Sequence, residues 1–336
     1  MKYYYYNDFP LGIATGGKED QLKFVVKRAK QVFGLAKDLA TVNSFEDNSI
    51  LHCFGDTPHF SAIAKYLTGT GKNFKFIISP NFFRRKALIY KISKISSLLG
   101  PNWWSQRHEM YQLASLIIVN SSYEKEYLRK IFGDFILSKT VVIYNTYELV
   151  NHKSNPKLKK DFPYLVSIAH INERKNPFNL LKAAERVYKE TGITTILIGG
   201  LRFSEKNNVK KFLNLIDRSV GVKWEGEQCS ATAMQFLSNS LGHILPSFVE
   251  SPGLSNIQAY LFKKPMVCGD FPIVREYFKH IPIYCGFRSK NIERAMISLI
   301  RSSQPKFENK KNIQWSSENV SKQYIKLFEN IYETSI

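Results

Sequence analysis

The chain has 336 residues, a length that favours two domains over a single hydrophobic core. Hydrophobic residues make up 44% of it, which excludes general disorder. The net charge of +20 indicates an anionic partner: a membrane surface, a phosphorylated substrate or nucleic acid. This excess is spread along the chain, because residues 1–150 hold 20 basic and 12 acidic side chains and the remainder holds 28 and 16.

The four cysteines are too far apart in the sequence to form a paired metal or redox motif, which suits a reducing compartment. Cys53 and Cys268 lie in apolar runs and are expected to be buried thiols. No run reaches about 18 consecutive apolar residues, and the N-terminus has no apolar run of signal length. We therefore expect a cytoplasmic protein whose membrane association can only be peripheral.

Short apolar runs alternate with amphipathic stretches along the chain, which predicts parallel sheets covered by helices on both faces. The runs that predict strands are Leu11–Ala14, Ile50–Phe54, Phe74–Ile78, Leu116–Asn120, Val141–Tyr144, Tyr164–Ala169, Thr194–Ile198, Val222–Trp224, His243–Leu245, Pro265–Cys268 and Pro282–Tyr284. The clearest helical patterns are Asp20–Leu39, Pro177–Glu190, Asn291–Arg301 and Glu318–Tyr332. The polar stretch His152–Asp161 predicts a linker between two α/β domains.

A basic segment, Phe82–Trp104, lies in the first half of the chain. Its arginines and lysines alternate at helical spacing with Leu88, Ile92, Ile95 and Leu99, and two tryptophans follow a Gly-Pro break. This pattern favours peripheral contact with an anionic membrane. A domain helix that points its lysines to water explains the pattern equally well.

The stretch Leu245–Glu276 is the most specific motif. A short apolar strand breaks at Pro246, and Glu250, a Pro-Gly turn, an amphipathic helix and a second buried strand follow. A helix N-terminus carries free backbone N–H groups and a partial positive charge, so it suits a phosphate. The stretch resembles the donor-sugar motif of retaining glycosyltransferases of family 4.

That resemblance implies an α/β GT-B fold, in which two Rossmann-like doubly wound domains face each other across a cleft. Residues 1–150 would bind the acceptor, and residues 151–316 would bind the nucleotide sugar. Residues 317–336 would form a C-terminal helix that packs back on the first domain. The implied enzyme is a hexosyltransferase-type glycosyltransferase (EC 2.4) that retains the anomeric configuration. It would act on a surface polysaccharide or glycolipid precursor.

The resemblance also assigns roles on the donor side. Arg174 and Lys175 match the cations that stabilise the leaving diphosphate, and Glu250 matches the glutamate that contacts the donor-sugar hydroxyls. The other residues expected around the nucleotide sugar are His170, Gly199, Gly200, Glu227, Ser251, Gly253, Leu254 and Gln258. The donor is expected to be UDP- or GDP-linked. We expect no cofactor and no metal, because the chain has no Asp-x-Asp motif.

On the acceptor side, Gly16 and Gly17 resemble the glycine loop that faces the diphosphate. The family's active-site histidine falls at Phe54, and His59 lies close by in the next loop as the alternative catalytic group. A second departure is Gln258, which stands where the family has its second glutamate.

These departures motivate a second hypothesis, a catalytically weakened relative that binds a nucleotide sugar. A third hypothesis of another class is a nucleic-acid-binding protein, motivated by the charge alone. The sequence contains no aromatic RNA-binding motif, zinc finger or basic arm in its favour, so no nucleic acid partner is expected. The expected partners are a nucleotide sugar and a hydroxyl-bearing glycan or lipid-linked acceptor.

Overall fold

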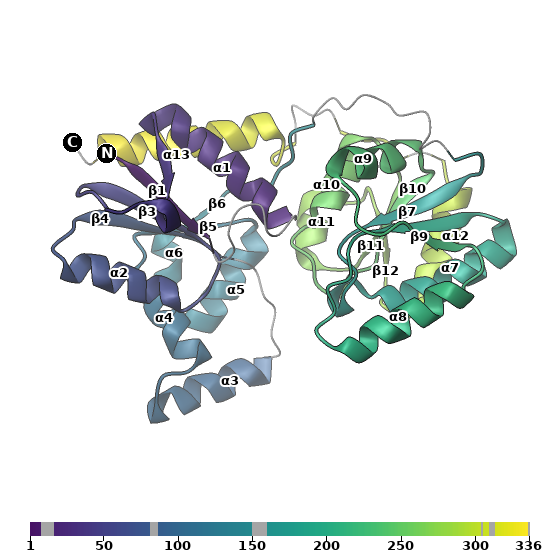
Figure 1. The fold of residues 1–336 in the computed structure, drawn as a ribbon, viewed down its shortest axis with the longest axis horizontal. Coiled ribbons are helices and arrows are strands. Elements are labelled where there is room, and N and C mark those ends of the chain that lie inside the picture. The colour runs from purple at the N-terminus through teal and green to yellow at the C-terminus, as the bar shows by residue number, and fades with distance from the viewer. Residues whose placement is uncertain (8–16, 81–86, 150–159, 304, 309–312, 335–336) are drawn as a thin grey trace. The chain divides into compact units, whose positions relative to one another are not determined.

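The computed structural model describes residues 1–7, 17–80, 87–149, 160–303, 305–308 and 313–334 (Figure 1). The chain forms two compact units. Unit 1 comprises Met1–Thr146 and Lys310–Ile336, and unit 2 comprises Tyr147–Asn309. The chain therefore leaves unit 1 after Thr146 and returns to it at Lys310.

Unit 1 is built on a six-stranded, wholly parallel sheet in the order β2-β1-β3-β4-β5-β6. Its strands are β1 (Tyr3–Asn7), β2 (Ala36–Asp38), β3 (Ser49–Phe54), β4 (Phe74–Ser79), β5 (Leu116–Val119) and β6 (Thr140–Val142). Its helices are α1 (Gly17–Phe33), α2 (His59–Gly69), α3 (Ala87–Ser96), α4 (Trp103–Leu113), α5 (Ser122–Phe132), α6 (Phe135–Lys139) and α13 (Ser317–Glu333), with short 3-10 turns η1 (Leu39–Thr41) and η2 (Ser97–Leu99). The β2-β1-β3-β4-β5 order is one of the two common doubly wound arrangements.

Successive side chains of these strands enter two separate cores. Tyr3, Tyr5 and Ile50 pack under α1 and α13, whereas Tyr4 and Leu51 pack under α2, α4 and α5. This period of two places an apolar layer on each face of the sheet, as a sheet covered on both sides requires.

The C-terminal helix α13 completes the first of these cores. It lies beside α1, with the last segment of the chain (yellow) against one of the first (purple) (Figure 1). Val320 and Phe328 are fully buried in this core, and the buried Arg28 of α1 donates from Nη2 to the Ser321 hydroxyl at 2.7 Å.

Unit 2 is built on a second six-stranded parallel sheet, in the order β12-β11-β10-β7-β8-β9. Its strands are β7 (Tyr164–Ile168), β8 (Thr194–Ile198), β9 (Val222–Trp224), β10 (Gly242–Leu245), β11 (Met266–Gly269) and β12 (Ile283–Cys285). Its helices are α7 (Pro177–Thr191), α8 (Lys206–Arg218), α9 (Ser230–Asn239), α10 (Leu254–Leu261), α11 (Pro272–Phe278) and α12 (Ser289–Arg301), with a 3-10 turn η4 (Glu173–Lys175). Numbered within the unit, the order is 3-2-1-4-5-6, that of the Rossmann fold.

Most predicted strands are confirmed, but the beginning of the chain differs. The sequence reading missed β1, and the predicted strand Leu11–Ala14 lies outside the described residues. The predicted helix Asp20–Leu39 is wrong at its end. The helix stops at Phe33, because Gly34 takes a left-handed φ of 72°, and the chain then forms β2.

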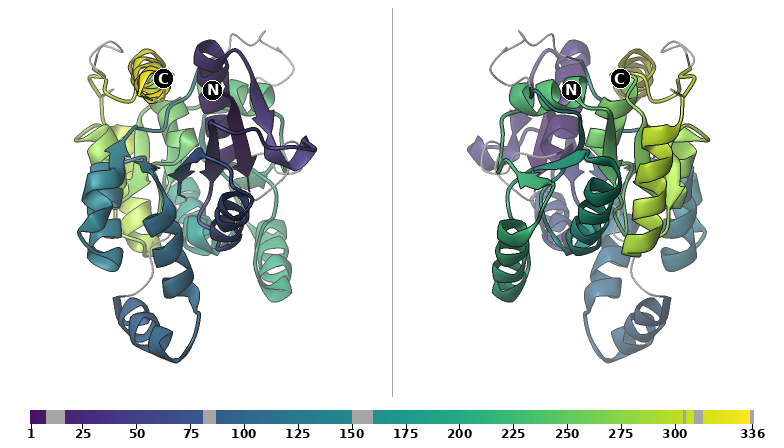
Figure 2. Two further views of the ribbon diagram at one scale, coloured as in Figure 1. Left: turned by 90° about the vertical axis from the view of Figure 1, so that its left-hand side faces the viewer. Right: turned by 90° about the vertical axis from the view of Figure 1, so that its right-hand side faces the viewer.

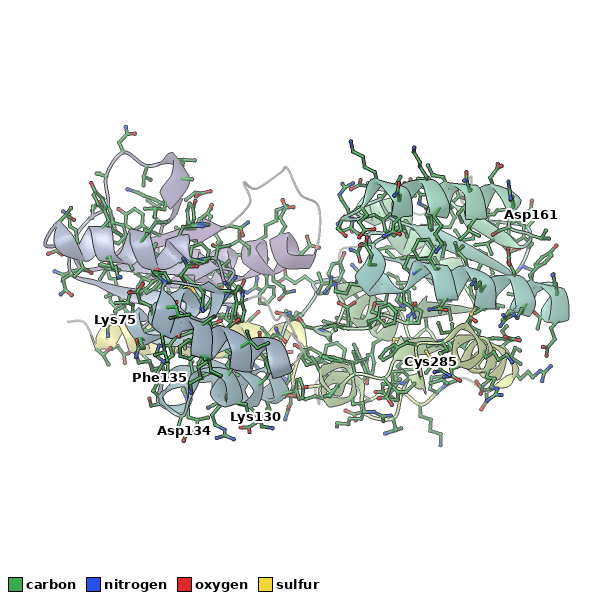
Figure 3. All side chains as sticks on the ribbon, turned by 90° about the horizontal axis from the view of Figure 1, so that it is seen from below. Lys75, Lys130, Asp134, Phe135, Asp161 and Cys285 are labelled. Carbon is green, nitrogen blue, oxygen red and sulfur yellow. The ribbon has the colours of Figure 1, made fainter. Side chains whose placement is uncertain are left out.

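None of the four cysteines, all of which are described, forms a disulfide. Cys53 and Cys268 are fully buried, which confirms the prediction. Cys285 in β12, which is labelled in Figure 3, is buried as well. Burial raises the pKa of the Cys285 thiol to about 12, so this thiol is protonated at neutral pH. Within the described part of the chain, no helix has the length and apolar content needed to cross a bilayer.

His52 is a fully buried histidine at the centre of the unit 1 sheet. Its Nδ1 lies 2.5 Å from the Tyr3 hydroxyl and its Nε2 lies 2.8 Å from Ser79 Oγ. The ring stacks on Phe54 with 4.0 Å between centroids. Burial lowers the pKa of His52 to about 3, so the ring is neutral in the folded protein.

His52→Gln is expected to flatten the pH dependence of stability in mild acid. The folded pKa of about 3 lies below the ordinary value of 6.5, so the stability that His52 contributes is complete above about pH 6.5 and is lost as pH falls towards 3. Glutamine can donate and accept but does not titrate. Denaturant titrations should show the slope of unfolding free energy against pH, between about pH 6 and 5, reduced by about 1 kcal/mol per pH unit. An unchanged slope would contradict the assignment.

Candidate functional site

The order of the unit 2 sheet fixes where a ligand site can form. The first strand, β7, lies between β8 and β10, so the connections after β7 and β10 run to opposite sides of the sheet. Ligands of doubly wound sheets bind at such a switch point, beyond the carboxyl ends of the strands. The segment after β7 contains Arg174 and Lys175, and the segment after β10 contains Glu250.

Two local contacts hold these segments together. The backbone N–H of Phe248 donates to the carbonyl oxygen of Arg174 at 2.9 Å. Asn176, which is 2% exposed and has a left-handed φ of 59°, donates from Nδ2 to the carbonyl oxygens of Pro246 at 3.3 Å and Phe287 at 2.8 Å. Asn176 therefore joins the loops that follow β7, β10 and β12 at the carboxyl ends of these strands.

An ion pair joins the two loops at the site. The Lys175 ammonium donates from Nζ to Oε2 of the Glu250 carboxylate, and Arg174 Nη1 lies 3.9 Å from the other oxygen, Oε1. The side chains of Lys175 and Glu250 are 13% and 8% exposed, whereas that of Arg174 is 46% exposed. The structure thus brings together Arg174, Lys175 and Glu250, three residues that the sequence singled out.

Burial and charge act on this pair in opposite directions. Burial acts most strongly on the pKa of Glu250 and would raise it, but the charges of Lys175 and Arg174 together hold that pKa below its usual value. Burial lowers the pKa of Lys175 and the charge of Arg174 adds to this, while Glu250 opposes both. The carboxylate is therefore ionised at neutral pH in a site with two cations and one anion.

The sequence reading missed several polar residues beneath this pair. His243 in β10 is fully buried, and burial, with a contribution from the Lys175 charge, lowers its pKa to about 3. Ser247 is 1% exposed at the start of the loop after β10. The signal that could have identified Asn176 is its place before Pro177, since an Asn-Pro pair marks a turn at a helix start.

Two glycines near the site leave no room for a side chain. At Gly199, with a φ of 147°, an added Cβ would lie 1.9 Å from the carbonyl oxygen of Ala169. At Gly253, with a φ of 88°, it would lie 2.9 Å from Glu250 Cγ. Gly253 directly precedes α10, so the chain turns from Glu250 into the start of that helix at close range.

The loops after β8 and β9 form a second cluster. Glu227 pairs with Arg202 at 3.0 Å, and an added Cβ on Gly200 would lie 2.4 Å from Glu227 Oε2. The indole Nε1 of Trp224 donates to the carbonyl oxygen of Gly199 at 2.9 Å. Gly199, Gly200 and Glu227, which were predicted to lie around the nucleotide sugar, therefore lie in one connected group.

The remaining predicted donor-side residues lie on the segments that follow β7 and β10. His170 follows β7 and is half-buried; Ser251 precedes α10 and is half-buried; Leu254 is the first residue of α10. Gln258 lies one turn further along α10 and is 7% exposed.

The predicted acceptor-side residues belong to unit 1. Gly16 lies outside the described residues, and Gly17 opens α1. His59 opens α2 after β3, is exposed, and has its Nε2 3.2 Å from Thr57 Oγ1. Phe54, where the family resemblance expects a histidine, is buried at the end of β3. Among the residues described, no three His, Cys, Asp or Glu side chains gather into a group that could hold a metal.

Comparison with known families bears on the same segment. Residues 151–314 match the family model "Glycosyl transferases group 1". The matched range contains the Lys175–Glu250 ion pair and the loops around it. A search of curated proteins finds no match.

Solved structures extend the likeness over nearly the whole chain. Anabaena HepE, in a complex with UDP and glucose, is 15% identical with a TM-score of 0.60, over 99% of each chain. An E. coli structure described as trehalose-6-phosphate bound with UDP-2-fluoro glucose is 9% identical with a TM-score of 0.66, over 98% of this chain and 96% of that one. S. aureus TarM is 17% identical with a TM-score of 0.56, over 86% of this chain and 55% of its own. These likenesses confirm the GT-B class of α/β fold.

Proposed function

We propose that the protein is a glycosyltransferase that moves a sugar from a nucleotide-sugar donor to a hydroxyl acceptor. The observation that carries this proposal is the Lys175–Glu250 ion pair, with Arg174 beside it, at the switch point of the unit that matches group 1 glycosyl transferases. HepE and the E. coli structure were solved with UDP-linked ligands, which favours a UDP-sugar as the first donor to test, with GDP-sugars next.

The side chains present suit the charges of such a donor. As the glycosidic bond breaks, the leaving nucleoside diphosphate gains negative charge, and fixed cations in a site of low water content stabilise it. Lys175 carries three donor protons, so it can bond Glu250 and a phosphate oxygen together. The Glu250 carboxylate can accept hydrogen bonds from two neighbouring sugar hydroxyls.

The proposed reaction retains the anomeric configuration and uses no metal or cofactor. The bond between the anomeric carbon and the phosphate oxygen breaks, and a bond to the acceptor oxygen forms on the same face. The acceptor proton passes to the departing diphosphate. Arg174 and Lys175 supply the positive charge, so the proposal assigns no ion to the site.

We place the acceptor among hydroxyl-bearing glycans or lipid-linked precursors of a surface polysaccharide. A hexose is the proposed transferred group, which makes the enzyme a hexosyltransferase. The free, largely buried thiols suit a reducing cytoplasmic location, which forms part of the proposal.

A calorimetric titration with a panel of UDP- and GDP-sugars, with and without EDTA, tests the proposal. We expect one donor to bind equally well in both conditions and to be consumed when an acceptor or water is present. Loss of binding in EDTA would contradict the metal-free site, and binding by no donor would overturn the proposal.

One observation favours a second candidate, a relative that binds the donor without turning it over. Phe54 fills the position of the expected histidine and is buried against His52. Tight donor binding with no transfer and no hydrolysis, over a broad acceptor panel, would favour this candidate.

A further inference from the structure

The segment after β4 exposes an apolar surface that the proposed reaction does not use. Ile92, Ile95, Leu98 and Leu99, here named the α3–η2 face, are 57%, 69%, 86% and 93% exposed. Single exposed apolar residues are normal on a protein surface, but four of them within eight residues form a patch that indicates an interaction site.

This surface does not belong to a buried domain helix. Residues 92, 95 and 99 recur at helical spacing, and their exposure shows that the apolar side, rather than a lysine side alone, is open. The α3 helix extends beyond the rest of unit 1 in all views (Figures 1 and 2).

The tryptophans of the segment do not take part in this surface. Trp104 is 9% exposed, and its Nε1 donates to the carbonyl oxygen of Ile131 at 3.0 Å. Trp103 opens α4 and is half-buried, with the Arg107 guanidinium 4.5 Å from its ring. Among the described residues of Phe82–Trp104, the exposed apolar surface therefore consists of the α3–η2 face.

The hydrogen bonds of one polar side chain, Asn102, hold the α3–η2 face in place. Asn102 donates from Nδ2 to the Ser93 carbonyl oxygen at 2.6 Å and to Ser96 Oγ at 2.8 Å, while its Oδ1 accepts from the Trp104 and Ser105 backbone N–H groups. One side chain thus ties α3 to the capped start of α4. The apolar side chains are presented on a fixed element.

Charge decides which partner the face fits. Between Asp56 and Glu109 the sequence holds nine lysines and arginines and no acidic residue. Five of them, Arg84, Arg85, Lys86, Lys91 and Lys94, lie within eleven residues of the sequence, just before or among residues 92–99. Lys65 and Arg107 pair with Glu109 and Asp56, which bound this run. Exposed leucines and isoleucines in a stretch of sequence that is basic and has no acidic residue match a bilayer with anionic headgroups.

We propose that the α3–η2 face docks the protein on an anionic lipid bilayer, with its apolar side chains in the headgroup boundary and the exposed Lys94 against the lipid phosphates. This docking does not depend on the proposed transfer reaction. If the acceptor is lipid-linked, the same contact brings it to unit 1, because α3 continues the chain from the carboxyl end of β4.

Vesicle co-sedimentation with the full chain tests the proposal. We expect binding to vesicles of phosphatidylcholine mixed with phosphatidylglycerol, weak binding to pure phosphatidylcholine, and a decrease with added salt. The double variant Leu98→Ser/Leu99→Ser should bind anionic vesicles at least about tenfold more weakly, since two exposed leucines lose their burial in lipid. Lys94→Glu should weaken binding several-fold.

Matched controls lie in unit 2. Leu213→Ser/Val220→Ser removes two side chains that are 40% and 59% exposed, and Lys210→Glu reverses an exposed lysine of α8. Neither should alter vesicle binding, and thermal unfolding should show that the α3–η2 variants remain folded. The proposal is overturned by no binding to anionic vesicles, by equal binding to both vesicle types, or by a double variant that binds like the parent.

A self-association result has its own signature. If sedimentation velocity shows an oligomer that Leu98→Ser/Leu99→Ser dissolves, and vesicles do not bind, then the face covers a second copy of the chain and the bilayer proposal fails. Donor titrations can succeed or fail independently of these measurements, so the two proposals are separable.

Discussion

Lys175→Ala is expected to lower the rate of sugar transfer by more than about tenfold, because it removes a fixed cation from the place where the leaving diphosphate gains charge. Lys175 is 13% exposed and pairs with Glu250, so solvent does not replace its charge easily. Single-turnover kinetics with saturating donor would measure the effect on the transfer step itself. Full activity in this variant would contradict the role in phosphate stabilisation.

The same substitution also affects stability, and a second variant separates the two effects. Removing Lys175 leaves the buried Glu250 carboxylate with Arg174 alone at 3.9 Å, and breaking a buried pair in this way costs about 3 kcal/mol. Lys175→Met/Glu250→Gln removes both charges, so it should recover most of the stability and none of the activity. Recovered activity would show that Lys175 acts only through the fold.

A surface pair offers the matched control for stability. Arg301 and Glu190 lie 2.6 Å apart, with side chains 67% and 43% exposed. Arg301→Ala should change the free energy of unfolding by less than about 1 kcal/mol, because solvent screens an exposed pair.

Glu250→Ala is expected to weaken binding of the sugar nucleotide far more than binding of the free nucleoside diphosphate. The carboxylate would accept hydrogen bonds from sugar hydroxyls, and its loss should raise the Kd for the donor by more than about tenfold. Free nucleotide should bind as well as before or more tightly, because Lys175 and Arg174 lose the anion that opposes them. Parallel calorimetric titrations of donor and free nucleotide measure both.

Glu250→Gln gives the graded control for this prediction. The amide keeps one acceptor oxygen but loses the charge, so it should fall between the parent and Glu250→Ala in donor affinity. Equal losses of donor and free-nucleotide affinity in both variants would show that Glu250 holds the loop together rather than recognising the sugar.

The strands of unit 2 were predictable because most of them coincide with short apolar runs of the sequence that are separated by amphipathic stretches. Thr194–Ile198 and Val222–Trp224 match β8 and β9 residue for residue. In unit 1, β1 was missed because its tyrosines and asparagine do not form an aliphatic run, although aromatic residues favour strands. The strand β2, three residues long with a lysine and an aspartate, carries no hydrophobic pattern at all.

The sequence predicted which residues belong to the site, but it did not predict how they are arranged in space. Arg174, Lys175 and Glu250 stood out by their motifs, but Lys175 and Glu250 are 75 positions apart in sequence. They meet because β7 and β10 are neighbours in the sheet. No local sequence pattern specifies the order of the strands. Asn176 and His243 were missed for the same reason, since their importance lies in what the neighbouring loops and strands bring to them.

The position of α13 has a consequence for biosynthesis. A ribosome completes β1 to β6 and then all of unit 2 before it reaches Ser317–Glu333, yet Val320 and Phe328 fill the core beside Tyr3. Until Ser317–Glu333 has been made, the α1 side of the unit 1 sheet is not covered by α13. Every strand of unit 2 has been made by then. We expect a released chain truncated before residue 317 to resist protease in unit 2 and to be cleaved readily in unit 1, and a fragment ending at Thr146 to require α13 supplied separately as a peptide.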